Sequence, residues 1–240
     1  MKKILLIGAQ HGDETVGEKL YRRICSVKHD LLANIDYIVG NPEAVKFNKR
    51  YIESDLNRSY AATSLKTYEE RRAKEILSYI KKGHYELILD LNTTTCLDQP
   101  PCFIMNQQPE AVRRFIRASN ISKLVHLTHD IMATSLLWFV PHGIAIEVPE
   151  ETIDDKLLDE LIFTIEQYLA GNVSQTEVEL YETNELLLVK DVHESHIAHL
   201  KNFEYNQHYK CYPILCGESS YRHTTNYIGF KADTMRVIEL

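Results

Sequence analysis

Hydrophobic and polar positions follow two different periods through the first two thirds of the chain. Residues 4–7 are a continuous apolar run, which is typical of a strand buried on both faces of a sheet. Residues 14–27 then carry apolar side chains at the spacing of an amphipathic helix, at Val16, Leu20, Ile24 and Val27. A buried strand followed directly by such a helix predicts an α/β layer.

The same alternation continues further along the chain. Thr67 and Glu70 match the capping-box pattern, in which each side chain accepts a hydrogen bond from the other residue's backbone, and they predict a helix to about residue 82. The remaining predicted helices are 109–119 and 154–169, and the remaining predicted strands are 34–39, 85–92, 102–107, 123–130 and 142–150. This order predicts a mixed, largely parallel sheet flanked by helices.

The pattern changes near residue 170. The stretch "AGNVSQTE" at 170–177 has the composition of a linker, and the tyrosine-rich segment after it shows strand-like runs without a strong helical period. We therefore predict two domains, a larger α/β domain at 1–172 and a small β-rich domain at 173–240.

Composition and charge narrow the class of protein. With 44% apolar and 25% charged residues, the chain has the composition of a soluble globular protein. Its apolar runs are too short for a signal peptide or a membrane-spanning helix, so we expect a cytoplasmic protein without membrane association. A net charge of −7 argues against nucleic acid as a partner. A small anionic substrate and a homo-oligomer are both compatible with the sequence.

The five cysteines show no CxxC spacing, which favours free thiols in a reducing compartment. Cys96 follows a predicted strand close to other polar residues. It is a candidate nucleophile, although buried, unreactive cysteines are common.

Residues with metal-binding potential follow the first strand directly. His11 and Glu14 lie three residues apart, which can turn an imidazole and a carboxylate toward one ion. Residues that follow a strand in an open α/β sheet often bind ligands. The alternative interpretation is a histidine in a polar loop and an acidic residue that favours the start of a helix.

A second polar cluster, "NKRYIESDLNRSY", lies in a long connection between regular elements. Arg50, Asn57 and Arg58 could hold a carboxylate, because the planar guanidinium group binds one with two hydrogen bonds. Alternatively, these residues are solvated surface charges. Glu147 ends an apolar run, where partial burial would raise the pKa of its carboxyl group and suit it to proton transfer. It could also be an exposed residue at a strand end.

Five ordered motifs together resemble a known family. The motifs are "GAQHGDETVG", "GNPEAV", "RYIESDLNR", "LDLNTTT" and "IEVP", with a fainter similarity in "PILCGESSY". They resemble the aspartoacylase/succinylglutamate desuccinylase family, which hydrolyses acyl amino acids and has the zinc-carboxypeptidase fold. The resemblance runs from the first strand to about residue 150, and "RYIESDLNR" favours the aspartoacylase branch.

The resemblance implies a role for each matching residue. His11 and Glu14 resemble the first two ligands of a single zinc ion, and Glu147 resembles the glutamate that activates water and protonates the leaving amine. Arg50 resembles the arginine that polarises the scissile carbonyl group.

Other residues resemble those that contact the substrate. Asn57 and Arg58 resemble the pair that holds the substrate carboxylate. Tyr221 resembles a substrate-contacting tyrosine, although Arg222 fits that position equally well in the alignment.

One departure from the family pattern affects the metal. The family's Asp-Leu-His-Asn-Thr-Thr appears here as Asp90, Leu91, Asn92 and three threonines, so Asn92 replaces the histidine that is the third zinc ligand. An alignment with a gap would instead delete the histidine, but a one-residue deletion in a strand turns every later side chain to the opposite face. The amide of Asn92 would bind zinc more weakly than imidazole.

A second departure affects the substrate. No Arg or Lys occurs in residues 131–147, where the aspartoacylase branch has an arginine for the side-chain carboxylate of its substrate. N-acetylaspartate is therefore not the expected substrate. Trp138 and Phe139 are candidates to line an apolar acyl pocket instead, unless they belong to the core.

The sequence leads to two hypotheses. The first is a zinc-dependent hydrolase that cleaves the amide bond of an N-acyl amino acid or a similar small carboxylate, with one weakly bound ion. The alternative is a metal-deficient, catalytically impaired relative that binds a small carboxylate.

Overall fold

The computed structural model describes residues 3–96, 98–128, 133–197, 199–218 and 225–240. In this part of the chain, one mixed sheet has the strand order β2-β1-β3-β6-β4-β5-β7-β9-β8. The strands are β1 (Ile4–Gly8), β2 (Ile35–Val39), β3 (Leu87–Thr94), β4 (Cys102–Met105), β5 (Lys123–Leu127), β6 (Gly143–Pro149), β7 (Glu177–Leu188), β8 (Tyr212–Ile214) and β9 (Tyr227–Glu239).

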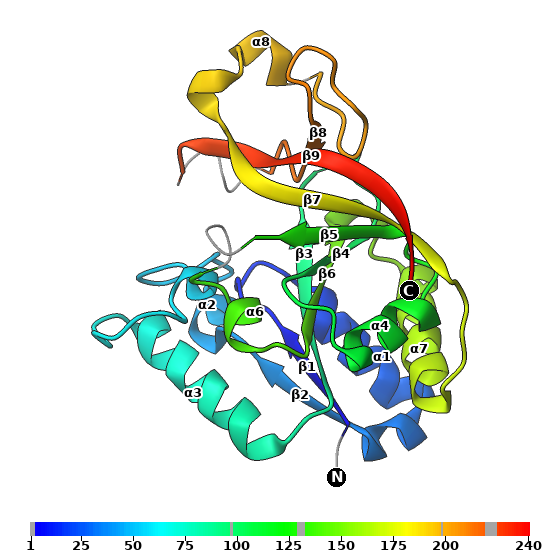
Figure 1. Ribbon diagram of the computed structural model, residues 1–240. Coiled ribbons are helices and arrows are strands. Elements are labelled where there is room, and N and C mark those ends of the chain that lie inside the picture. Colours follow the sequence, from blue (N-terminus) through cyan, green and yellow to red (C-terminus); the bar gives the residue numbers. More distant parts are fainter. Residues whose placement is uncertain (1–2, 97, 129–132, 198, 219–224) are drawn as a thin grey trace.

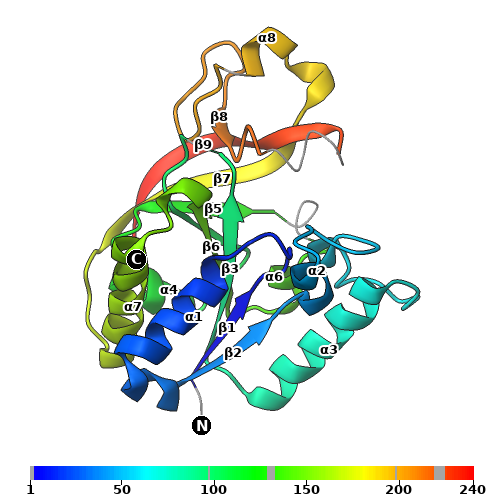
Figure 2. The same cartoon turned by 180° about the vertical axis from the view of Figure 1, so that it is seen from behind.

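Helices cover both faces of the sheet (Figures 1 and 2). The α-helices are α1 (Val16–Val27), α2 (Pro42–Lys46), α3 (Tyr68–Gly83), α4 (Glu110–Ala118), α6 (Leu136–Phe139), α7 (Asp155–Ala170) and α8 (Glu194–Ile197). Short 3-10 helices are η1 (His29–Ala33), η2 (Leu56–Arg58), η3 (Glu150–Thr152) and η4 (Val189–Asp191). Helices α1, α4 and α7 lie together on one side, and α3 lies on the other.

The alternation of side chains along β1 explains this layering. Ile4 and Leu6 join a core cluster with α1, α4 and α7, whereas Leu5 and Ile7 join a separate cluster with α3 and α6. All four side chains are fully buried. A strand covered on both faces must be apolar at every position, which is the pattern that residues 4–7 show.

The sheet is mostly parallel, as predicted, with antiparallel pairings at β6–β4, β7–β9 and β8–β9. The predicted capping box is also present, because Thr67 and Glu70 each accept a hydrogen bond from the other's backbone N–H at the start of α3. The sequence did not predict that β4 would run antiparallel to β6, and it did not predict the short helix α6.

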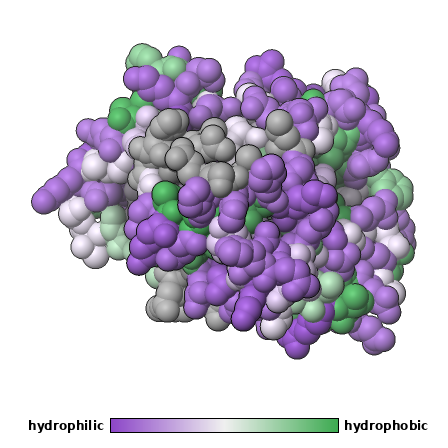
Figure 3. All heavy atoms as spheres, turned by 90° about the horizontal axis from the view of Figure 1, so that it is seen from above, coloured by the Kyte–Doolittle hydropathy of each residue, from purple (hydrophilic) through white to green (hydrophobic). Residues whose placement is uncertain are grey.

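The C-terminal segment continues the same sheet. Strand β7 pairs in parallel with β5, and the long strand β9 pairs with β7 along nearly its whole length. Figure 1 shows these strands arching over the carboxyl end of the α/β layer, with α8 above them. Seen from above in Figure 3, hydrophilic side chains cover most of this face, with hydrophobic ones scattered among them. The predicted boundary at 172/173 stays a prediction.

Candidate active site

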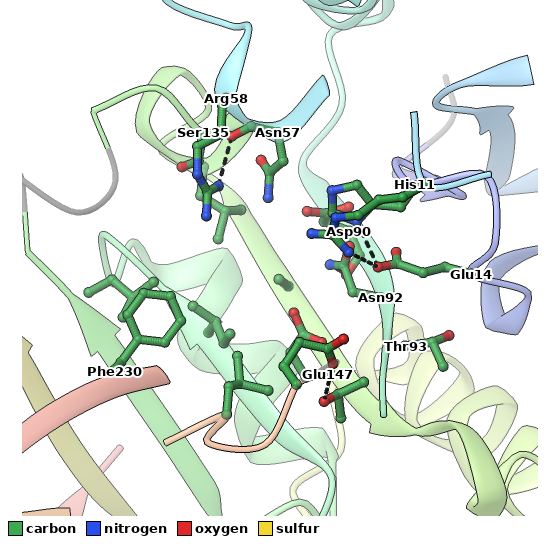
Figure 4. A pocket seen from close by; sticks show the side chains of 18 residues that line it. His11, Glu14, Asn57, Arg58, Asp90, Asn92, Thr93, Ser135, Glu147 and Phe230 are labelled. Carbon is green, nitrogen blue, oxygen red and sulfur yellow. Dashed lines mark hydrogen bonds and ion pairs between the residues drawn. The ribbon is translucent and has the colours of Figure 1, made fainter. Parts of the chain in front are cut away.

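A pocket lies at the carboxyl ends of β1, β3 and β6, where a parallel sheet presents the residues that follow its strands. Six of the residues singled out in the sequence line it together with Asn92: His11, Glu14, Arg50, Asn57, Arg58 and Glu147. Tyr221 and Arg222 lie outside the described residues. Figure 4 shows the side chains that line the pocket.

The loop after β1 is fixed by close backbone packing. A Cβ atom on Gly12 would lie 2.2 Å from the backbone carbon of Ala44 in α2, so only glycine fits there. The N–H of Gly12 donates to the carbonyl oxygen of Arg50 at 3.1 Å. These contacts place His11 against the polar connection that carries Arg50.

His11 is the centre of a buried charge network. Its Nδ1 lies 2.7 Å from Oε1 of Glu14, and its Nε2 lies 3.0 Å from Oδ1 of Asp55. Burial alone would lower the pKa of the imidazole, but the carboxylates of Glu14 and Asp55 outweigh burial and raise it to about 10. Without a metal ion, His11 is therefore an imidazolium at neutral pH.

Asp55 joins this network to the polar connection. Burial would raise the pKa of Asp55, but His11, Arg58 and Arg50 hold it well below its usual range. Its Oδ1 also accepts from the N–H of Asn57 at 2.8 Å, which caps η2. Arg50 lies 3.5 Å from Asp55 and 3.9 Å from Glu14. Asp55 was part of a quoted motif, but sequence reasoning gave it no role.

Asn57 and Arg58 form the upper part of the pocket in Figure 4. Oδ1 of Asn57 accepts from the N–H of Leu136 at 3.1 Å, so the amide group is oriented with its NH₂ away from α6. Arg58 is exposed and donates from Nη2 to the hydroxyl of Tyr227 at 3.3 Å. Asn57 and Arg58 therefore present hydrogen-bond donors suited to a carboxylate. Tyr227 of the C-terminal segment contacts Arg58 of this pair.

Asn92 and Glu147 are adjacent across the β3–β6 pairing. Nδ2 of Asn92 donates to the carbonyl oxygen of Asp90 at 3.3 Å. The Asp90 carboxylate accepts from Gln10 at 2.6 Å, and burial raises the pKa of Asp90 to about 6. Asn92 thus lies in the pocket next to Glu147 and close to the buried carboxyl group of Asp90, for which the sequence had predicted no role.

Glu147 faces a strongly acidic environment. Burial, followed by the charges of Glu14, Asp90 and Glu218, raises the pKa of its carboxyl group well above the usual value. The carboxylate of Glu218 comes from the loop after β8 and accepts from Thr94 Oγ1 at 2.8 Å and from Thr95 N–H at 2.8 Å. Glu218 belongs to the "PILCGESSY" stretch, but nothing in the sequence around it predicted a place in the site.

For three further side chains near the pocket, the structure distinguishes between the interpretations that the sequence left open. Phe139 is 40% exposed, and Trp138 packs partly buried against a core cluster, so neither lines the pocket as one interpretation suggested. Their neighbour Leu137 lines it instead. Burial raises the pKa of the Cys96 thiol to about 12, which keeps it protonated and disfavours a nucleophilic role.

Some of the side chains in the pocket are suited to bind a metal ion. The buried Oε2 of Glu14 has no hydrogen-bond partner among the described residues, and Nδ1 of His11 points to the same carboxylate. Nε2 of His11 contacts the Asp55 carboxylate. A metal-binding histidine usually donates its second ring N–H to a carboxylate in this way. The described residues hold no group of three His, Cys, Asp or Glu side chains arranged for a metal, and the polar side chain beside Glu147 in the strand pairing is the Asn92 amide. The site therefore fits one ion with two strong ligands.

The sheet topology and a His-x-x-Glu pair at the carboxyl end of β1 define a zinc-carboxypeptidase-like α/β protein. Residues 1–175 match the succinylglutamate desuccinylase/aspartoacylase catalytic domain, and the chain belongs to this family. The resemblance of the five motifs is thereby confirmed, while the replacement of the third ligand by Asn92 stays a prediction.

Individual relatives agree with this assignment. A probable aspartoacylase from Nostoc sp. is 29% identical over 197 residues, which cover 72% of this chain and 67% of the relative. Aspartoacylase from Mus musculus is 33% identical over 109 residues, covering 40% of this chain and 35% of the relative. The match to the mouse enzyme thus spans about a third of that protein.

Solved structures show the same fold. Murine aminoacylase 3 superposes with a TM-score of 0.72 at 18% identity, covering 99% of this chain and 96% of the other. Succinylglutamate desuccinylase from Chromobacterium violaceum gives a TM-score of 0.71 at 15% identity, covering 100% and 85%. The predicted fold class is confirmed. None of the described helices is long and apolar enough to cross a membrane.

Proposed function

We propose that this protein is a metal-dependent amidohydrolase that cleaves the amide bond of an N-acyl amino acid or a similar small carboxylate. The observation that carries the proposal is the convergence of His11, Glu14 and Glu147 with Arg50 and Arg58 in one pocket. Membership of the family supports the same reaction class. A surface role for these residues would not bring them together from three separate segments of the chain, the loop after β1, the connection at 50–58 and strand β6.

We propose zinc as the metal, held by Nδ1 of His11 and the carboxylate of Glu14, with the Asn92 amide oxygen as a weak third ligand. When bound, the ion would supply Lewis-acid chemistry to the site. Asp55 would keep the proton of His11 on Nε2 and so leave Nδ1 available as a ligand. Because an amide replaces an imidazole, we expect binding to be weakened by several kcal/mol out of the roughly 10–16 kcal/mol of a structural zinc site.

The chain's own residues divide the remaining tasks. Arg58 and Asn57 bind the substrate carboxylate, and Arg50 donates to the carbonyl oxygen as negative charge develops on it. Glu147 removes a proton from water as the water oxygen attacks the carbonyl carbon. Glu147 then gives this proton to the nitrogen as the C–N bond breaks, which yields an amine and a carboxylic acid, and the acid passes its proton to solvent or to the amine. The raised pKa of Glu147 makes its carboxylate a stronger base for the first of these proton transfers.

A second candidate function follows from Asn92. Because the third ligand position carries an amide, the site could bind a carboxylate through Arg58 and Asn57 without retaining a metal. The lack of three ionisable metal ligands among the described residues favours this candidate. It predicts stabilisation by N-acyl amino acids without turnover.

The two candidates are separated by measuring metal content and amine release on the same protein. Protein purified with zinc is expected to contain metal and to release amine from N-acyl amino acids, and a chelator should abolish the release. Glu147→Gln should lose turnover and keep ligand-induced thermal stabilisation. Glu150→Gln, an exposed residue just beyond β6, is the matched control and should retain activity.

Each negative result has a distinct meaning. Metal-loaded protein that is stabilised by these ligands but releases no amine would contradict the hydrolase. Protein that holds no metal, is stabilised by these ligands and releases no amine would support the binding candidate. Protein that neither binds nor cleaves them would contradict both.

A further inference from the structure

One wall of the pocket is apolar. Six side chains form it, and they come from β4, β5, α6, β6, the segment after β8, and β9: Ile104, Leu127, Leu137, Ala145, Leu215 and Phe230. Each is at most 6% exposed. Figure 4 shows Phe230 across the pocket from His11 and Glu14. This wall is therefore a surface that a ligand could cover, opposite the polar groups.

Carboxyl groups outnumber guanidinium groups around the wall. Asp90, Glu147 and Glu218 line the pocket with carboxyl groups, and the cationic guanidinium groups among the lining residues are Arg50 and Arg58. Arg50 lies close to Asp55 and Glu14. Arg58, with the oriented amide of Asn57, is accordingly the place for one substrate carboxylate.

A second carboxylate on the ligand would meet the apolar wall. There it would lose its hydration without a cationic partner among the described lining residues, and it would lie near the carboxyl groups of Glu147 and Glu218. An apolar group of the same shape would instead gain from burial against the six side chains.

We infer that the site selects N-acyl amino acids that carry a single carboxylate and an apolar group, and that it discriminates against substrates with two carboxylates. The apolar group is either the amino-acid side chain or the acyl chain. Leu137 and Phe230 are the residues that set this specificity. The inference rests on the proposed function, since it names the substrate class of that site.

The apolar wall is rigidly connected to the carboxylate-binding pair. The N–H of Leu136 donates to Asn57, and the next residue of the same short helix, Leu137, faces the pocket. Phe230 is held in β9 by pairing with Ile214 of β8 and Leu186 of β7. The position of a ligand carboxylate bound at Asn57 is therefore fixed relative to the apolar wall.

The test compares substrates of equal shape. N-acetyl-leucine and N-acetylaspartate have side chains with the same number of heavy atoms, and they test the side-chain arm. N-(4-methylpentanoyl)glycine and N-succinylglycine are matched in the same way for the acyl arm. We expect kcat/KM to favour the apolar member of at least one pair by about 100-fold or more, because its competitor buries an unpaired charge. The pair that shows the preference identifies the group that contacts the wall.

Variants of α6 make the test specific. Leu137→Arg adds a cation to the wall and should reduce or reverse the preference, whereas Phe139→Arg adds the same charge to an exposed position of that helix and should leave it unchanged. If Leu137→Arg does not fold, Leu137→Ala provides a second test of the same position. It should lower kcat/KM for the preferred apolar substrate by about tenfold and leave the acidic one unaffected.

Binding calorimetry with the same four ligands separates this inference from the proposed function. A preference in affinity without turnover would support the inference and contradict hydrolysis. Equal or better use of the acidic members in both pairs, or no binding of any of the four ligands, would overturn the inference.

Discussion

At the scale of single residues, His11 determines the behaviour of the site. Both of its ring nitrogens lie close to carboxylate oxygens, and these negative charges favour the protonated imidazolium form. A metal ion binds only the neutral imidazole. The same two carboxylates also suit the bound metal, Glu14 as a ligand and Asp55 as the partner of the distal nitrogen. Proton and metal therefore compete for one position.

This competition gives a pH dependence for the metal-free protein. The pKa of His11 rises from 6.5 to about 10 on folding, so the folded state binds the proton more tightly than the unfolded state. The stabilisation is complete below pH 6.5 and is lost as the pH rises toward 10. We expect the free energy of unfolding in chelator to fall by about 4 kcal/mol more in the wild type than in His11→Gln over this range.

The measurement is urea unfolding at several pH values. His29→Gln, an exposed histidine outside the site, is the control and should follow the wild type. A wild-type profile parallel to that of His11→Gln would mean that His11 is neutral in the folded protein.

Asn92 gives the second prediction at this scale. Asn92→His supplies an imidazole at the position next to Glu147, and we expect zinc affinity to rise by about 100-fold or more, because imidazole is the stronger ligand. Competition with a chelator of known affinity measures this. Asn120→His adds a histidine at an exposed site and should not change the affinity. An unchanged affinity in Asn92→His would place residue 92 outside the metal site.

At the scale of elements, one buried carboxylate positions the polar connection. Glu69, in the first turn of α3, is fully buried and accepts from the backbone N–H groups of Ile52 at 2.7 Å, Glu53 at 3.2 Å and Ser54 at 3.1 Å. It also accepts from Asn41 at 3.1 Å, just before α2. The segment between Arg50 and Asn57 is thus tied to α3 rather than free to move.

We predict that Glu69→Gln disturbs the site without contacting substrate. The amide would turn a donor toward backbone N–H groups, which should cost about 1–3 kcal/mol of stability and displace Arg50 and Asn57. We expect kcat/KM to fall about tenfold, mainly through KM, because a small displacement of binding groups has a large effect. Steady-state kinetics and thermal unfolding measure the two effects.

The control for this variant is Glu75→Gln, an exposed residue of α3 paired with Arg72. It should have wild-type kinetics and nearly wild-type stability. Loss of stability in Glu69→Gln with unchanged KM would mean that the connection keeps its geometry without this anchor.

At the scale of the whole molecule, the pocket uses residues from both predicted domains. Leu215, Glu218 and Phe230 line it from the C-terminal segment, and the other lining residues belong to the α/β layer. The sheet is continuous from β5 to β7, so hydrogen bonds cross the predicted boundary. Folding of the two parts is therefore expected to be coupled.

Calorimetry tests this coupling. We predict one thermal transition for the full chain, with the van't Hoff enthalpy close to the calorimetric enthalpy. Two resolved transitions would instead support a C-terminal domain that folds separately. The same scan with N-acetyl-leucine would show whether ligand binding shifts the whole transition, as a pocket built from both parts requires.

Much of the fold could be predicted because its signals are local. The buried run of β1, the helical spacing of α1 and the capping box of α3 each depend on residues a few positions apart. The antiparallel insertion of β4 between β6 and β5 depends instead on distant pairing, and no local pattern records it. Likewise, His11, Glu14 and Glu147 could be selected by type and spacing, whereas the roles of Asp55 and Glu218 required their spatial neighbours.

The sequence by itself determined the order of strands and helices, the chemical groups available and the family, because periodicity and motifs are properties of neighbouring positions. Only the tertiary structure shows that Asp55 contacts the second ring nitrogen of His11. It also shows that Phe230, from the C-terminal strand β9, forms part of the apolar wall of the pocket. These facts depend on which segments the fold brings together. His11 and Asp55 lie 44 residues apart and meet through contacts between loops, whereas Phe230 is placed by strand pairing, and no spacing along the chain encodes either contact.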